Sequence, residues 1–280
     1  MGERTIHVSS PQAATFGELI AAQAPEREVV LLPDPADFPA AVRPARVIFA
    51  PYPPREGWAP ARRLELVQLC GVGVDHFFPT ADLPPNVEIA GMRGAFSEDA
   101  AEHAMTMLLA LARELPSFLE DQRARAWKQR MVPRLRGRRL ALIGLGGIGT
   151  AIAKRAAAFG LEVRGICRTP RKMEHLDAVY GRQGLHGLAA WCDALVIAAP
   201  LTPETAGMID AAVIACLRKG AIVVHLARGG IVDERALLAR LEAGTLSAAL
   251  DVFVDEPLAE TSPFFGLANV IVTPHVAGFG

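Results

Sequence analysis

The sequence predicts an α/β protein with two doubly wound parallel-sheet domains. Short runs of β-branched and apolar residues alternate with helical patches, which is typical of parallel sheets covered by helices on both faces. A glycine-rich turn at 144–149, G-L-G-G-I-G, stands between an expected strand and an expected helix. The 280 residues, of which 51% are hydrophobic, are enough to form the cores of two domains.

The first domain is expected at residues 1–97. Proline-containing turns separate its expected strands, which are 5–9, 29–32, 46–50, 66–69 and 87–90. A long helix is then expected at 97–115, where Ser97 can cap the first turn and Pro116 stops the last. We expect this helix to be the spacer that leads into the second domain, residues 98–280.

The second domain repeats the alternation of strand and helix. Its expected strands are 140–143, 162–167, 194–198, 221–226, 247–251 and 270–273. Helices fit between them, notably from the glycine-rich turn to Phe159, at 211–218 and at 233–243. Six strands in such a series describe a doubly wound nucleotide-binding domain.

The glycine-rich turn favours a dinucleotide site. Gly144 permits a tight turn, Gly146 lets the backbone approach a pyrophosphate, and Gly149 lets the helix pack on the strand. Unpaired N–H groups at the helix start would then face the phosphates. An ordinary glycine-rich turn is the alternative, and the strand–turn–helix context favours the dinucleotide.

The end of the second strand of this series bears on which dinucleotide binds. An Asp or Glu there would bind the ribose 2′-hydroxyl of NAD. Cys167 stands at that place instead, 18 residues after Gly149, and Arg168 and Thr169 follow it. An arginine can bind a 2′-phosphate, so the sequence favours NADP(H) over NAD(H), with a solvated basic loop as the alternative.

Three residues near the ends of expected strands form a candidate catalytic set. Arg228 can bind a substrate carboxylate through two hydrogen bonds, and the glycines after it would let the substrate come close. His275 lies at the sheet edge where parallel sheets bind ligands. Glu256 would keep that imidazole protonated near neutral pH, ready to donate to a carbonyl oxygen.

These motifs resemble the D-isomer-specific 2-hydroxyacid dehydrogenases, which include glyoxylate/hydroxypyruvate reductases and phosphoglycerate dehydrogenases. The resemblance implies a flavodoxin-like substrate domain and a Rossmann dinucleotide-binding domain, with the site in the cleft between them. It also implies a homodimer joined through the nucleotide domain. The matching stretches are L-C-G-V-G-V-D-H at 69–76, A-A-E-H at 100–103, Trp127, G-L-G-G-I-G, P-L-T-P-E-T at 200–205, A-R-G-G-I-V-D-E at 227–234, D-V-F-V-D-E-P at 251–257 and T-P-H-V-A-G at 273–278.

The resemblance further implies roles for individual residues. Arg228 would bind the substrate carboxylate and carbonyl, His275 would be the acid/base, and Glu256 would support it. Backbone N–H groups of Val72 and Gly73 would bind the substrate carboxylate from the first domain. Asp251 would face the nicotinamide amide. The residues expected to contact the cofactor are Gly144, Gly146, Gly147, Ile148, Gly149, Arg168, Thr169, Pro200, Thr205, Leu226, Asp251 and Gly278.

The chain departs from the family pattern in four places. His225 stands where the family has Asn before A-R-G, the loop 244–250 is one residue short, and 91–94 lacks the Asn that often precedes the spacer helix. The chain also stops five residues after His275, without the family's C-terminal return helix. We expect this to leave apolar surface uncovered on the first domain.

The combined interpretation is an NAD(P)-dependent oxidoreductase that transfers hydride between a nicotinamide and a small D-2-hydroxy acid or 2-keto acid, with glyoxylate and hydroxypyruvate favoured. The alternatives are a phosphoglycerate dehydrogenase-like enzyme and a non-catalytic NAD(P)(H)-sensing protein on the same fold. A net charge of −1 argues against a nucleic-acid or anionic-membrane partner. Four scattered cysteines indicate reduced thiols without a metal, and the absence of an export signal or membrane span predicts a cytoplasmic protein.

Overall fold

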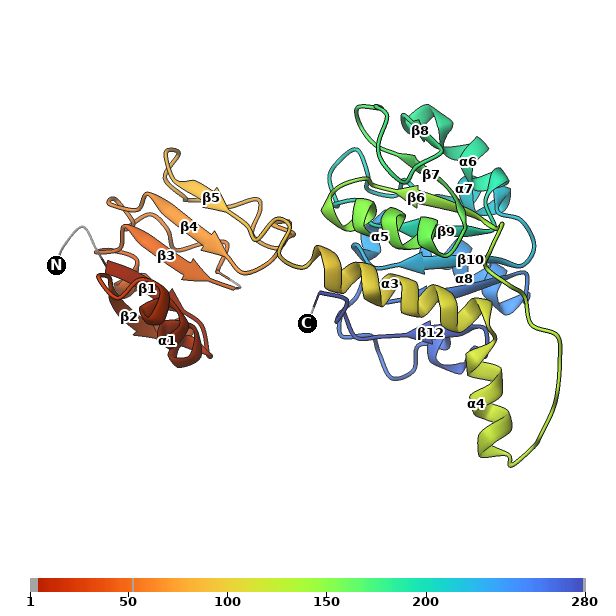
Figure 1. The fold of residues 1–280 in the computed structure, drawn as a ribbon. Coiled ribbons are helices and arrows are strands. Elements are labelled where there is room, and N and C mark those ends of the chain that lie inside the picture. Colours follow the sequence, from red (N-terminus) through yellow and green to blue (C-terminus); the bar gives the residue numbers. More distant parts are fainter. Residues whose placement is uncertain (1–4, 52, 279–280) are drawn as a thin grey trace. The chain divides into compact units, whose positions relative to one another are not determined.

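The structure is a computed structural model that describes residues 5–51 and 53–278. The chain divides into two compact units, Met1–Ala95 and Phe96–Gly280. This boundary lies two residues before the one expected from the sequence. Each unit contains one parallel sheet, which confirms the predicted α/β class (Figure 1).

The sheet of the first unit has five parallel strands in the order β2-β1-β3-β4-β5. This is the flavodoxin-like strand order, in which the chain reverses direction across the sheet between β1 and β3. Helix α1, Ala13–Gln23, and the short α2, Phe38–Ala41, belong to the connections. The strands are β1 Thr5–Ser9, β2 Glu28–Leu32, β3 Val47–Ala50, β4 Leu66–Leu69 and β5 Glu88–Ala90.

The sheet of the second unit has seven parallel strands in the order β12-β11-β10-β9-β6-β7-β8. In chain order this is the Rossmann sequence with one further strand, and its direction reverses between β6 and β9. Ligands bind beside such a reversal, outside the carboxyl ends of the strands. The strands are β6 Arg139–Ile143, β7 Glu162–Ile166, β8 Ala178–Tyr180, β9 Ala194–Ile197, β10 Ala221–His225, β11 Leu246–Leu250 and β12 Val270–Val272.

Alternation along the strands builds two apolar layers, one on each face of this sheet. Leu140 and Leu142 pack with α3 and α5, whereas Ala141 and Ile143 join the core under α6, α7 and α8 (Figure 1). Successive strand side chains point to opposite faces, so both faces of a central strand must be apolar. The helices are α3 Ser97–Ala112, α5 Gly147–Ala158, α6 Leu185–Trp191, α7 Ala211–Cys216 and α8 Glu234–Glu242.

Two details predicted for the spacer helix are wrong. Its N-cap is Phe96, which makes no side-chain capping hydrogen bond, and Ser97 is already the first helical residue. A left-handed residue, Glu114 with a φ of 56°, separates α3 from a further helix, α4 Leu115–Arg123. Pro116 therefore starts this second helix, because the first turn does not use the N–H group that proline lacks.

The sequence also missed β8, and it gave no bounds for α6. β8 has only three residues, all half-buried at the edge of the sheet, so no alternating pattern of useful length exists there.

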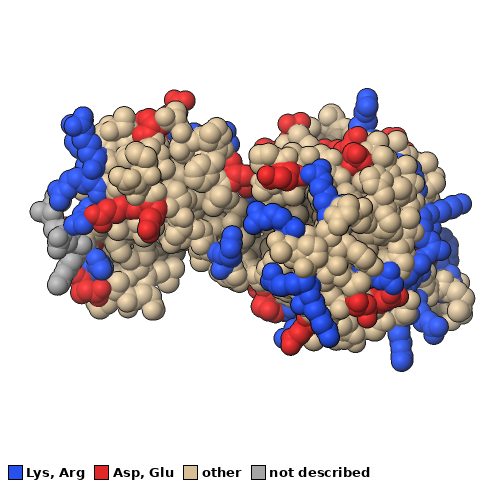
Figure 2. Space-filling model, turned by 90° about the horizontal axis from the view of Figure 1, so that it is seen from above, with Lys and Arg blue, Asp and Glu red and all other residues tan. Residues whose placement is uncertain are grey.

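The described helices include none with both the length and the apolar character of a membrane span. Across residues 5–51 and 53–278, no three His, Cys, Asp or Glu side chains gather as metal ligands. Figure 2 shows acidic and basic side chains interspersed over the visible surface of each unit.

Candidate active site

The glycine-rich turn lies at the point where the strand order reverses. A Cβ on Gly144, which has a φ of 94°, would lie 2.6 Å from backbone atoms of Ala199, two residues after β9. A Cβ on Gly149 would lie 2.0 Å from the Gly144 carbonyl oxygen. Gly146, the exposed N-cap of α5, has open space around it. The turn is therefore closed on the protein side and open toward solvent, which suits a pyrophosphate at the helix N-terminus.

The loop after β7 contains the residues expected near the ribose. Cys167 donates a hydrogen bond from Sγ to the carbonyl oxygen of Thr169, 3.2 Å away. Arg168 and Thr169 are exposed, and no carboxylate stands at position 167.

Sequence reasoning missed two charged residues near this loop. Arg182, just after β8, donates from Nη1 to the backbone carbonyl of Glu204 at 2.5 Å. A hydrogen bond from Thr202, together with the positive charges of Arg168 and Arg182, holds the pKa of the Glu204 carboxyl below its usual range. Both arginines therefore place positive charge beside the same carboxylate. Arg182 was missed because the strand that precedes it was missed.

Other expected cofactor residues have clear local roles in the second unit. Thr205 donates from Oγ1 to the Pro200 carbonyl at 2.6 Å and so closes the loop after β9. Leu226 is buried in the core under α3 and α5. Gly147 and Ile148 form the first turn of α5. A Cβ on Gly278 would contact the Phe96 side chain at 3.5 Å.

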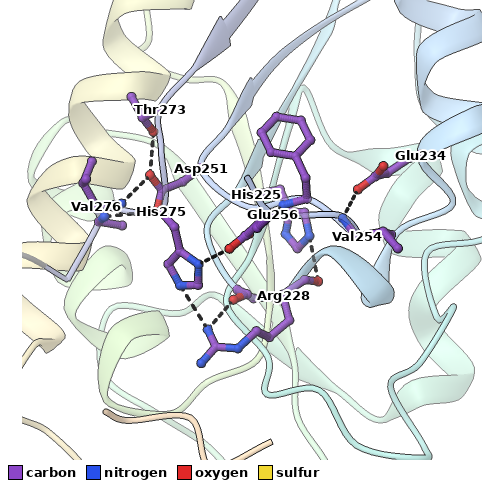
Figure 3. Close-up of polar contacts among 12 residues, drawn as sticks. His225, Arg228, Glu234, Asp251, Val254, Glu256, Thr273, His275 and Val276 are labelled. Atoms are coloured by element: carbon purple, nitrogen blue, oxygen red, sulfur yellow. Dashed lines mark hydrogen bonds and ion pairs between the residues drawn. The ribbon is translucent and has the colours of Figure 1, made fainter. Parts of the chain in front are cut away.

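The structure brings the three candidate catalytic residues together, with His275 between Glu256 and Arg228. His275 Nδ1 lies 2.7 Å from Glu256 Oε2, and its Nε2 lies 3.4 Å from Arg228 Nη1 (Figure 3). The same Nη1 donates to the carbonyl oxygen of Ala227 at 2.8 Å. The His275 side chain is 42% exposed, so a ligand can approach the imidazole. The carboxylate, the imidazole and the guanidinium thus form one polar cluster.

Gly229 and Glu256 fix the loops that carry this cluster. Glu256 accepts a hydrogen bond from the Phe253 N–H through Oε1, at 2.9 Å, which leaves Oε2 for His275. A Cβ on Gly229 would lie 2.0 Å from the Phe253 carbonyl carbon. The prediction named both glycines after Arg228. Gly229 is buried and lets the two loops touch, so only the exposed Gly230 stays a candidate for making room for a substrate.

Asp251 holds the segment that contains His275. Its buried carboxylate accepts hydrogen bonds from the Thr273 hydroxyl at 2.6 Å and from the N–H groups of Val276 and Ala277, each at 3.0 Å (Figure 3). Its backbone carbonyl accepts the His275 N–H at 2.8 Å. These hydrogen bonds fix the backbone course of the loop that contains His275. The role predicted for Asp251 toward the nicotinamide stays a prediction.

His225, which the resemblance led us to expect as Asn, contacts the backbone of Arg228. Its Nε2 donates to the Arg228 carbonyl at 3.0 Å, since a carbonyl oxygen only accepts. Burial lowers the pKa of His225 to about 4, and its hydrogen bond to Arg228 offsets part of that shift. The side chain is therefore neutral near pH 7 and serves as a donor, as an Asn amide would.

Val72 and Gly73 belong to the first unit, in the loop that follows β4. Val72 is 41% exposed, and the Met92 N–H holds the start of the loop by bonding to the Gly71 carbonyl at 3.0 Å. The loop stands at the carboxyl edge of its own sheet, where parallel sheets bind ligands. The role predicted for its backbone N–H groups stays a prediction.

Known proteins match both the fold and these motifs. Residues 105–277 match the family model described as D-isomer specific 2-hydroxyacid dehydrogenase, NAD binding domain. A D-isomer specific 2-hydroxyacid dehydrogenase from Xanthobacter autotrophicus, solved with NADPH and MES, has a TM-score of 0.87 and 32% identity, with 100% of this chain and 90% of that one covered. An NADPH-dependent glyoxylate/hydroxypyruvate reductase from Sinorhizobium meliloti, solved with NADP and sulfate, has a TM-score of 0.89 and 29% identity, covering 99% and 89%.

Curated relatives extend the comparison to longer proteins. D-3-phosphoglycerate dehydrogenase from Mycobacterium bovis is 36% identical over 257 residues, which are 90% of this chain and 47% of that protein. The enzyme of the same name from Rattus norvegicus is 36% identical over 221 residues, or 77% of this chain and 41% of that protein. The chain thus spans about half the length of the curated relatives it matches. By its family-model match over residues 105–277 and its similarity to solved members, it belongs to the D-isomer specific 2-hydroxyacid dehydrogenase family.

Proposed function

We propose that the protein is an NAD(P)-dependent reductase of small 2-keto acids, with glyoxylate and hydroxypyruvate as its preferred substrates and D-2-hydroxy acids as products. The observation that carries this proposal is the pair of contacts that His275 makes, one with Arg228 and one with Glu256. A carboxylate clamp, a proton donor and a charge partner are the groups that reduction of a 2-keto acid requires from the protein. The turn at 144–149 suits the dinucleotide.

Bound NAD(P)H supplies the hydride, and the chain supplies position and the proton. Arg228 has donors only, so at 3.4 Å it faces the lone pair of His275 Nε2, and the ring proton then lies on Nδ1 toward Glu256. A substrate carboxylate draws the guanidinium to itself through two charge-assisted hydrogen bonds. Nε2 is then free to hold a proton, which it donates to the carbonyl oxygen as hydride reaches the carbon.

The test is a turnover screen of glyoxylate, hydroxypyruvate, pyruvate and phenylpyruvate with NADPH and with NADH. Arg228→Gln should lower kcat/KM on the best keto acid by about tenfold to hundredfold, the equivalent of roughly 1.5–3 kcal/mol for a charge-assisted contact. Cofactor affinity should stay near that of the unmutated protein. Arg235→Gln, an exposed position on α8, is the matched control. Full activity in Arg228→Gln would place the carboxylate clamp elsewhere.

Two other functions are outcomes of the same screen. The 36% identity to D-3-phosphoglycerate dehydrogenases favours phosphohydroxypyruvate as a fifth substrate, and a preference for it would make this chain phosphoglycerate dehydrogenase-like. Tight cofactor binding without turnover on any keto acid would instead support a nucleotide-sensing protein.

We also propose that NADPH is preferred over NADH. The support is the absence of an acid at Cys167 and the positive charges of Arg168 and Arg182 at the ends of neighbouring strands. Arg168→Ala should raise the KM for NADPH by about tenfold to hundredfold and leave that for NADH nearly unchanged. Cys167→Asp should act in the same direction, because a carboxylate repels the phosphate and accepts from the 2′-hydroxyl. Equal kcat/KM for the two cofactors in the unmutated protein would refute the preference.

The remaining proposals concern location and assembly. All four cysteines, at positions 70, 167, 192 and 216, are free thiols, which supports a reducing compartment such as the cytoplasm. A homodimer is proposed through α4 and the segment after it, where Trp127 and Met131 are almost fully exposed.

A further inference from the structure

We propose that His103, on α3, is a positioning residue for the imidazole of His275 and acts through Thr273 and Asp251. Its Nε2 lies 3.1 Å from Thr273 Oγ1 and 3.6 Å from Asp251 Oδ1. The proposed reaction gives this histidine no task, although its side chain is only 22% exposed and reaches across to the loop of His275. The inference rests on the proposed function only for its turnover readout.

The number of protons on each group determines which atom donates in each hydrogen bond of this network. Asp251 can only accept as a carboxylate, so the Thr273 hydroxyl donates its single proton to Oδ1 across 2.6 Å. Thr273 Oγ1 must then accept from His103, which carries a proton on Nε2. The network therefore runs in one direction, from the imidazole of His103 through the hydroxyl to the carboxylate.

Asp251 links this hydrogen-bond network to the backbone around His275. His275 has a φ of 54°, in the left-handed region that a residue with a side chain rarely adopts. Three backbone N–H groups in succession, at 275, 276 and 277, donate to the carbonyl or the carboxylate of Asp251. Figure 3 shows the carboxylate of Asp251 between Thr273 and Val276, with a hydrogen bond from each. Rotation of that carboxylate would release this loop and misplace the ring.

Helix α3, which contains His103, is held in place by contacts outside the loop of His275. It packs against β10 and β11, and Glu102, the neighbour of His103, accepts a hydrogen bond from Arg155 of α5 at 3.1 Å. The position of His103 is therefore fixed by elements that do not depend on the loop it holds. A rigid donor outside the loop is what a positioning role requires.

The test compares His103→Ala with His103→Gln, whose amide nitrogen can still donate to Thr273. His103→Ala should lower kcat for keto-acid reduction about tenfold, because small displacements of a catalytic group cost large factors in rate, with both KM values within about twofold. His103→Gln should regain most of the loss. Thr273→Val should match His103→Ala, Thr273→Ser should stay active, and the double variant His103→Ala/Thr273→Val should be no slower than either single one.

Three kinetic results would each overturn the proposal: an unchanged kcat in His103→Ala, no rescue by Gln, or multiplied losses in the double variant. If His103→Ala does not fold, the comparison of Thr273→Val with Thr273→Ser decides in the same way. A second readout needs no turnover, namely the NMR signal of the His275 ring, assigned with His275→Gln. Displacement of that signal in His103→Ala and its return in His103→Gln support the network even if every keto acid fails. An unmoved signal refutes it.

Discussion

The contact of 2.7 Å between Glu256 Oε2 and His275 Nδ1 predicts that Glu256 orients the imidazole for catalysis. Glu256→Gln replaces a charge-assisted hydrogen bond by a neutral one, so it should lower kcat/KM for keto-acid reduction by about tenfold or more, the equivalent of roughly 1.5–3 kcal/mol. Glu234→Gln is the matched control, because Glu234 accepts from the Val254 N–H and not from His275. An unchanged kcat/KM in Glu256→Gln would mean that another group orients the ring of His275.

A second residue-scale prediction concerns acid stability and His225. Burial lowers the pKa of His225 to about 4 from 6.5, so the native state disfavours the charged ring. The stability this neutral residue contributes is fully present above about pH 6.5 and is lost as the pH falls toward 4, by up to about 3 kcal/mol at 1.36 kcal/mol per unit. His225→Asn can keep the hydrogen bond to Arg228 without titrating. Urea unfolding at pH 7 and at pH 4.5 should show a smaller loss in the variant, and equal losses would contradict this account.

At the scale of elements, the contact between two loops depends on Gly229. A Cβ there would meet backbone atoms of Phe253 and Val254 at 2.0–2.3 Å, and backbone cannot rotate away as a side chain can. Gly229→Ala should lower stability by about 1–3 kcal/mol or more and also reduce kcat/KM, since it parts Arg228 from Glu256. Gly230→Ala is the control, because its Cβ would only touch the Leu201 side chain at 3.6 Å. Equal melting temperatures for the two variants would refute the packing argument.

The elements that the sequence revealed are those whose pattern is local. Apolar β-rich runs marked the central strands, and glycine spacing marked the turn at 144–149. β8 has too few residues to show an alternating pattern. Nothing in the sequence around Glu114, whose backbone is left-handed, distinguishes a break from a continuous helix. The contact of His103 with Thr273 joins residues 170 positions apart, so only the folded chain reveals it.

At the scale of the whole molecule, α4 and residues 124–131 form an arm that extends away from the seven-stranded sheet (Figure 1). Ion pairs hold this arm in shape: Arg130 pairs with Asp121 at 2.5 Å and with Glu114 at 3.1 Å, and its guanidinium lies 3.9 Å from the centre of the Phe118 ring. The ordered arm presents Trp127 and Met131 to solvent, 93% and 95% exposed. Large apolar side chains in such a place are typical of protein interfaces, which are enriched in Trp and Met.

The arm predicts that the protein is a dimer whose dissociation constant depends on Trp127 and Met131. Burial of each side chain is worth roughly 1.5–3 kcal/mol. The double variant Trp127→Ala/Met131→Ala loses both contributions, so its dissociation constant should rise by about a hundredfold or more. Light scattering at micromolar concentration should change from twice the chain mass of 29.9 kDa to a single one. Phe265→Ala, which removes another exposed apolar ring from the same unit, should leave the dimer intact. A monomeric unmutated protein, or a double variant that still dimerises, would show that the arm serves another purpose.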